Sequence, residues 1–114
     1  MAFSEFELKR IEKEVGGLCV ARSPEHLRDE IRLEYRVQGH SIVIHEVRPH
    51  WRAPGELIEK FCAKIRYVRT RNVWQLYWQR TDLKWHLYEP LPEAGSLEPL
   101  VKHIDEDPHG CFFG

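Results

Sequence analysis

The run from Cys62 to Glu89, CAKIRYVRTRNVWQLYWQRTDLKWHLYE, decides the fold of this chain. Apolar and polar residues alternate along three of its segments, which is the period of a half-buried strand. The segments are Cys62 to Thr70, Val73 to Gln79 and Lys84 to Glu89, with short turns at Arg71-Asn72 and at Arg80-Thr81-Asp82-Leu83. Strands that follow one another through short turns pair antiparallel, so this run predicts a three-stranded meander.

Upstream of the meander, two more segments have the strand period. Apolar residues alternate with charged ones from Ile31 to Val37, and Ser41 to Val47 follows after Gln38-Gly39-His40. A short glycine-containing break between two such segments is typical of a hairpin. We therefore expect five strands, and the segment from Glu56 to Phe61 remains unassigned.

A helix is predicted near each end of the chain. Ser4 and Glu7 have the spacing of a capping box, and Leu8, Ile11 and Val15 follow on one helical face. Gly16-Gly17 is expected to end this helix, because glycine readily adopts the left-handed conformation of helix ends. Ser96 is expected to cap a last helix, whose apolar stripe is Leu97, Leu100, Val101 and Ile104.

These elements predict an α+β domain with a mostly antiparallel five-stranded sheet, a hairpin plus a meander, and both helices on one face. The 114 residues contain no linker or repeat, so a single domain over 1–114 is expected. No apolar run approaches the ~20 residues of a membrane span, and Met1 to Glu5 lacks the basic and apolar blocks of a signal peptide. The odd set Cys19, Cys62 and Cys111 favours reduced thiols, so we expect a cytoplasmic protein that binds no membrane.

The formal net charge of −1 conceals an uneven distribution of charge. From Lys60 to Tyr88 there are seven cations and one acid, whereas from Glu89 onward there are six acids and one cation. A chain that is close to neutral overall can therefore still carry a basic surface.

Alternation assigns the side chains of the meander to two faces. One face is predicted to form the core, with Ile65, Tyr67, Trp74, Leu76, Trp78, Trp85 and Leu87. The opposite face is predicted to carry Lys64, Arg66, Gln75, Tyr77, Lys84, His86 and Tyr88, extended at the turns by Arg69, Arg71 and Arg80. Cations neutralise phosphates and aromatic rings stack on bases, so this face predicts a surface for DNA or RNA.

A face of this composition does not require a nucleic acid. Lys, Arg, Gln and Tyr are normal on a solvated sheet face, and a basic face can equally meet an acidic partner protein or the acidic C-terminal stretch. The 11% of aromatic residues, four of them Trp, is also large for one small core. An apolar patch left over by that core predicts a homodimer. A non-enzymatic protein-interaction module that acts as a homodimer is therefore the alternative to a nucleic-acid binder.

No catalytic motif is recognisable, which favours a binding protein over an enzyme. His40, His45 and His50 recur every five residues, but residues five apart point to opposite faces of a strand. The close pairs of ligands that are typical of zinc sites do not occur, and Gly16-Gly17 follows a predicted helix, whereas phosphate-binding loops precede one. We expect no catalytic residue, no metal and no cofactor.

The run from Trp74 to Tyr88 resembles a bacterial family catalogued only as domain of unknown function 3024. Three further segments are similar to the same family: FELKRIEK from Phe6 to Lys13, EVRPHW from Glu46 to Trp51, and CFFG from Cys111 to Gly114. The resemblance spans nearly the whole chain. It implies a small, stand-alone bacterial protein, and it implies no activity, cofactor or catalytic residue.

Overall fold

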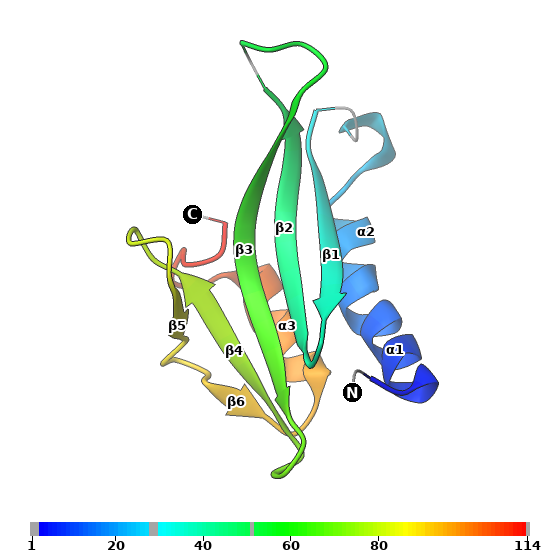
Figure 1. Ribbon diagram of the computed structural model, residues 1–114, viewed down its shortest axis with the longest axis vertical. Helices are drawn as coiled ribbons and strands as arrows, with labels where there is room; N and C mark the ends of the chain where they lie inside the picture. The colour runs from blue at the N-terminus through cyan, green and yellow to red at the C-terminus, as the bar shows by residue number, and fades with distance from the viewer. Residues whose placement is uncertain (1–2, 28–29, 51, 114) are drawn as a thin grey trace.

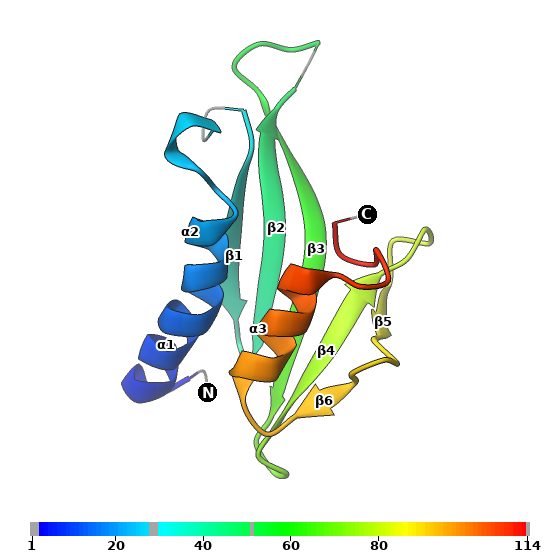
Figure 2. The same ribbon diagram turned by 180° about the vertical axis from the view of Figure 1, so that it is seen from behind.

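The computed structural model describes residues 3–27, 30–50 and 52–113. Within these ranges the chain forms two layers, an antiparallel six-stranded sheet and helices packed on one of its faces (Figures 1 and 2). The strands are β1 (Arg32–Gln38), β2 (Ser41–Pro49), β3 (Leu57–Val68), β4 (Val73–Gln79), β5 (Trp85–Leu87) and β6 (Glu93–Ala94). They lie in the order β1-β2-β3-β4-β5, and β6 also pairs with β4. The predicted α+β class is confirmed, and the sixth strand, two residues long, is too short to show any periodicity.

The N-terminal segment is one continuous helix with a π-helical turn in its middle. It consists of α1 (Glu5–Ile11), the π-turn η1 (Glu12–Gly16) and α2 (Gly17–Ala21). The predicted capping box is present, since the Ser4 hydroxyl accepts a hydrogen bond from the Glu7 N–H at 3.2 Å and the Glu7 carboxylate accepts one from the Ser4 N–H at 2.8 Å. Beyond α2 the chain forms the short 3₁₀ turn η2 (Glu25–Leu27).

The predicted stop at Gly16-Gly17 is wrong. Both glycines keep right-handed helical geometry, with φ of −60° and −61°. Glycine permits the left-handed conformation but does not impose it. Continuing the helix to Ala21 buries Leu18 and Cys19 against the sheet, and this burial outweighs the low helix propensity of glycine.

The C-terminal helix α3 (Leu97–Glu106) buries its predicted stripe, with Leu97, Leu100 and Ile104 inside the core. It ends at Asp107, which adopts the left-handed conformation. The Asp107 carboxylate then accepts hydrogen bonds from the N–H groups of Phe112 at 3.1 Å and Phe113 at 2.9 Å. These bonds tie the last described residues to the end of α3.

The core lies between the helices and the inner face of the sheet. Its fully buried aliphatic side chains include Ile11 and Val15 from the helix, Ile42, Ile44, Ile65 and Leu76 from the strands, and Leu100 and Ile104 from α3. Burying each large apolar side chain stabilises the fold by about 1.5–3 kcal/mol. The other face of the sheet, called the open face below, points toward the viewer in Figure 1, because the helices lie behind the strands.

The register of β5 differs from the predicted one. Gln79 pairs with Trp85, whereas a four-residue turn would have placed it opposite Lys84. The connection is longer by one residue because Leu83 takes a left-handed conformation, with φ of 62°, and the Arg80 N–H donates to the Lys84 carbonyl. A shift of one residue moves every side chain of a strand to the opposite face.

This shift exchanges the predicted faces of β5. Trp85 and Leu87 lie on the open face, not in the core, because Leu87 pairs with Tyr77. His86 pairs with Trp78 and lies on the inner side, and Tyr88 beyond it is fully buried. The predicted positions of these four residues are therefore wrong, while the assignments made for β3 and β4 are confirmed.

At one position on the outer edge of β1, the backbone is hydrogen-bonded to a side chain. The hydroxyl of Ser23, just after α2, accepts a hydrogen bond from the Leu33 N–H at 2.7 Å and lies 3.4 Å from the Leu33 carbonyl, to which it donates. The backbone groups of Leu33 would otherwise be free to pair with another chain. This side of the sheet is thus protected against strand addition at Leu33.

Candidate functional site

Two of the predicted nucleic-acid-binding cations form ion pairs at the turn between β3 and β4. Arg69 forms a two-bond pair with Glu7, with distances of 3.1 and 3.2 Å, and Arg71 forms one with Glu93, at 3.0 and 3.2 Å. The Arg69 guanidinium also keeps the pKa of the Glu7 carboxyl below its usual value. Both arginines are exposed, but their charges are balanced by neighbouring acids, so they add little positive potential.

Three other residues of the predicted surface are not on the open face of a strand. His86 lies 2.9 Å from the Asp82 carboxylate on the inner side of the sheet, and Lys84 is exposed in the connection before β5. The Arg80 guanidinium lies over the ring of Trp78, 5.5 Å from its centre, and Trp78 also belongs to the inner side. The structure therefore does not bring these three residues together with Lys64 and Arg66.

Tyr88 cannot stack on a ligand at the surface, because none of its area is exposed. Its hydroxyl lies 2.8 Å from Nε2 of His103 on α3, and its ring packs on Phe112 with 4.8 Å between ring centres. Desolvation raises the pKa of this hydroxyl. Its inclusion among the predicted binding residues is wrong, and Tyr88 joins β5, α3 and the tail within the core.

The members of the predicted surface that do lie together are Lys64, Arg66, Gln75 and Tyr77. Lys64 pairs across the strands with Tyr77, and Arg66 with Gln75. The Lys64 Nζ lies 5.9 Å from the centre of the Tyr77 ring. Among the described residues, neither Lys64 nor Arg66 has an acidic partner.

Two aromatic residues that were not predicted for this surface adjoin it. Phe61 on β3 and Trp85 on β5 face each other on the open face, with 6.1 Å between ring centres, and Phe61 is 39% exposed. Phe61 was missed because its segment was unassigned, and Trp85 because of the register of β5. We call Phe61, Lys64, Arg66, Tyr77 and Trp85 the open-face patch.

Beside this patch the open face carries a compact cluster of charges around a buried histidine. His45 on β2 is 5% exposed, and its Nε2 lies 3.6 Å from a Glu59 oxygen and 3.7 Å from a Glu34 oxygen. Arg36 pairs with Glu59, and Arg32 with Glu34 at 2.6 Å. Burial, and then the charge of Arg36, lowers the pKa of His45. These paired charges balance one another, so the positive charge that has no acidic partner among the described residues of the open face lies on β3.

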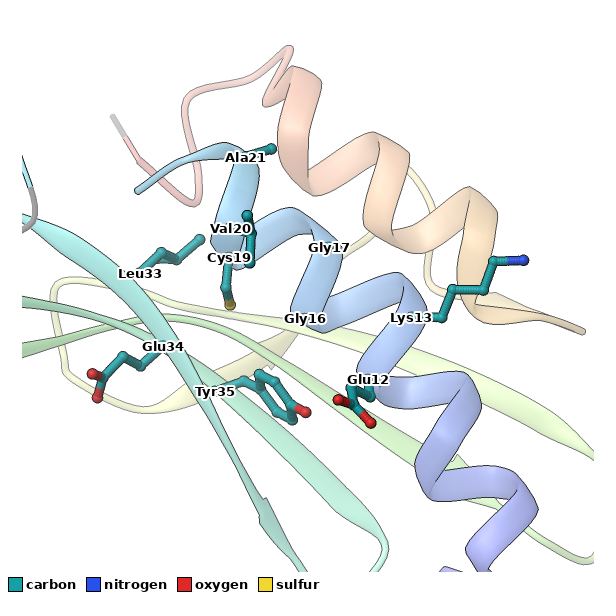
Figure 3. Close-up of a pocket in the computed structure, with 10 residues that line it drawn as sticks. All are labelled: Glu12, Lys13, Gly16, Gly17, Cys19, Val20, Ala21, Leu33, Glu34 and Tyr35. Atoms are coloured by element: carbon teal, nitrogen blue, oxygen red, sulfur yellow. The ribbon is translucent and has the colours of Figure 1, made fainter. Parts of the chain in front are cut away.

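A groove lies between the N-terminal helix and β1, away from the open face (Figure 3). It has a volume of about 760 Å³. The helix contributes Gly16, Gly17, Cys19 and Val20 to its walls, and β1 contributes Leu33 and Tyr35 (Figure 3). A groove of this size and apolar character can hold a small organic molecule. Sequence periodicity could not indicate it, because the π-turn that forms its wall interrupts the α-helical repeat.

None of the three cysteines is an activated nucleophile. All three cysteines are free thiols. Burial raises the pKa of Cys19 to about 12 and that of Cys62 to about 11, and it also raises that of Cys111. Thiols need a lowered pKa to react efficiently at neutral pH. No group of three His, Cys, Asp or Glu side chains in the described part of the chain is arranged to hold a metal ion.

None of the described helices is both long enough and apolar enough to cross a membrane.

Comparison with known proteins identifies a family. No curated protein and no solved structure matches the chain. The model of one family, described as Domain of unknown function (DUF3024), matches residues 3–114. The match covers essentially the whole chain, so this protein belongs to the DUF3024 family.

Proposed function

We propose that this domain is a non-enzymatic binding protein that takes single-stranded DNA or RNA on its open face. The observation that carries the proposal is the open-face patch, where Lys64 and Arg66 have no acidic partner among the described residues and lie beside Phe61, Tyr77 and Trp85. Proteins that bind single strands combine cations along the phosphate backbone with aromatic rings on which bases stack. A sheet face that no described helix covers leaves room for an extended strand of nucleotides.

The patch makes a quantitative prediction for binding. Fluorescence anisotropy with mixed DNA and RNA oligonucleotides at low salt should show binding that weakens as salt rises. Each phosphate contact contributes roughly 0.7 to the slope of log affinity against log salt, so K64A/R66A should lower that slope by roughly 1.4. F61A should weaken binding roughly tenfold, because stacking on one aromatic ring contributes about 1–3 kcal/mol per base.

The matched control is R71A, which removes a cation of the same type that is already paired with Glu93. It should leave both the affinity and the salt slope nearly unchanged. Binding that does not depend on salt would contradict the proposal. So would equal changes in affinity and salt slope for R71A and K64A/R66A.

A second candidate function rests on the apolar side chains of the same region. Leu57, Leu83 and Leu87 are 59%, 75% and 42% exposed, and Phe61 lines the same groove as Leu83. Such exposure is typical of a surface that another protein covers. We therefore also propose a protein-interaction module that acts as a homodimer. Light scattering at concentrations of about 100 µM should give twice the mass of the chain, and L83E/L87E should give the monomer; a monomeric wild type would remove this candidate.

We place this protein in the cytoplasm of a bacterium. The free state of Cys19, Cys62 and Cys111 supports a reducing compartment. The resemblance of the sequence to a bacterial family supports the source.

A further inference from the structure

One stretch of β3 pairs with a neighbour on one side only. β3 pairs with β2 from Leu57 to Arg66, but with β4 only from Ala63 to Val68. β4 ends at Gln79, and the chain then turns away into β5, so that β3 runs on beside β2 alone (Figure 1). Residues 57–61 of β3 thus have an open edge on the side where β4 would otherwise continue.

The register shows which backbone groups point toward this edge. The two-residue turn between β1 and β2 is closed by Gln38 and Ser41, and such turns are closed by a hydrogen-bonded pair. Backbone groups alternate in direction along each strand, so Glu46 and Arg48 of β2 bond to Lys60 and Ile58 of β3.

The N–H and C=O groups of Leu57, Glu59 and Phe61 therefore point to the open edge. The same alternation directs the backbone of Leu33 away from β2, and the Ser23 hydroxyl does bond to it there. Among the described residues no side chain makes an equivalent bond to Leu57, Glu59 or Phe61.

An apolar groove of about 680 Å³ lies along this edge. Its lining includes Ile58 and Phe61 of β3, together with Gln79 at the end of β4 and Leu83 in the turn that follows. The β-bulge at Cys62 separates the open stretch from the paired one, since Ile44 pairs with Ala63 and His45 with Phe61. Bulges commonly end the pairing of a strand and redirect its side chains.

The charges around the groove favour an acidic occupant. Lys60 lines the groove and Lys84 follows Leu83, and neither forms an ion pair among the described residues. The acid that lines the groove, Glu59, is already paired with Arg36. A second copy of this strand does not fit well, because antiparallel pairing centred on Glu59 would place two Glu59 carboxylates opposite each other.

We infer that the open edge of β3 binds an extended segment of another protein, with alternating apolar and acidic residues, as an added strand. Such a strand bonds through its backbone to Leu57, Glu59 and Phe61. Its apolar side chains on the open face pack on Phe61 and Leu57, and its acids on the inner side meet Lys60. This site uses the strand edge and does not involve Lys64 or Arg66, although it shares Phe61 with the open-face patch.

The test uses a fluorescein-labelled, capped peptide of about eight residues that alternates valine and glutamate, a usual length for one strand. Anisotropy should show saturable binding to the full chain, and amide hydrogen exchange should slow at Glu59 and Phe61 on binding. K60E should weaken the affinity at least tenfold. The matched control K102E, at an exposed lysine on α3, should not change it.

Two altered peptides decide between strand addition and other modes of binding. A peptide with every amide N-methylated lacks the backbone donors and should not bind, and a valine–lysine peptide should bind at least tenfold more weakly. Equal binding of the N-methylated peptide, protection of β1 in place of β3, or no binding below about 1 mM would overturn the inference.

Discussion

Replacing Tyr88 by alanine is expected to destabilise the fold strongly, with a loss of about 3–5 kcal/mol in the free energy of unfolding. Tyr88 has no exposed area, packs on Phe112 and hydrogen-bonds to His103. Its removal leaves a cavity between β5 and α3 and an unpaired histidine. Urea unfolding followed by circular dichroism measures the change.

The neighbouring substitution Leu87→Ala is the control. Leu87 is 42% exposed on the open face, and truncation of such a residue should cost less than about 1 kcal/mol. In the register predicted from simple alternation, Leu87 would lie in the core and Tyr88 in solvent. Leu87→Ala would then cost more stability than Tyr88→Ala. A larger loss for Leu87→Ala than for Tyr88→Ala would therefore show that the register of β5 is wrong.

A marked loss of stability at alkaline pH is expected from the two buried thiols. Cys19 and Cys62 have pKa values of about 12 and about 11 in the folded protein, above the 9.0 of an exposed thiol, because burial disfavours the thiolate. Near pH 10 the unfolded chain has lost most of both protons, while the folded chain keeps most of them. Each thiol then lowers the free energy of unfolding by roughly 1.4 kcal/mol per pH unit.

The stabilisation from these thiols is fully present below pH 9 and is lost as pH rises through the folded-state values. Urea titrations between about pH 8 and 11 should show a combined loss of roughly 2.7 kcal/mol per unit near pH 10. The variant C19A/C62A should start from a lower stability, because two core side chains are truncated. The free energy of unfolding of this variant should fall with pH less steeply than that of the wild type, by roughly 2.7 kcal/mol per pH unit near pH 10. Equal slopes for the two proteins would contradict the assignment of the effect to the thiols.

Local patterns predicted most elements of the fold. The capping box at Ser4, the β1–β2 hairpin, the bounds of β4 and the apolar stripe of α3 all depend on residues close together in the chain. The helix end at Gly16-Gly17 was wrong because a local preference competed with burial of Leu18 and Cys19 in a distant core. Propensity is outweighed wherever tertiary packing contributes more free energy.

The make-up of the open-face patch depended on information that no local pattern contains. Lys64, Arg66 and Tyr77 were placed correctly because β3 and β4 are joined by a tight turn that keeps their alternation in step. Phe61 lay in a segment without an assigned period, while Trp85 was missed and Tyr88 misplaced because a single left-handed residue, Leu83, lengthened the next turn. The ion pair of Arg69 with Glu7 joins residues 62 positions apart, which local sequence could not predict.

Periodicity and capping signals were enough to predict an α+β domain, its two helices and the order of its main strands, because these depend on interactions within a few residues. Only the packed structure decided which face β5 presents, which of the described cations have no acidic partner and where β3 keeps an open edge. The physical reason is that register and charge pairing are set by side chains from distant segments. One residue more or less in a turn is enough to exchange the buried and exposed faces of a strand.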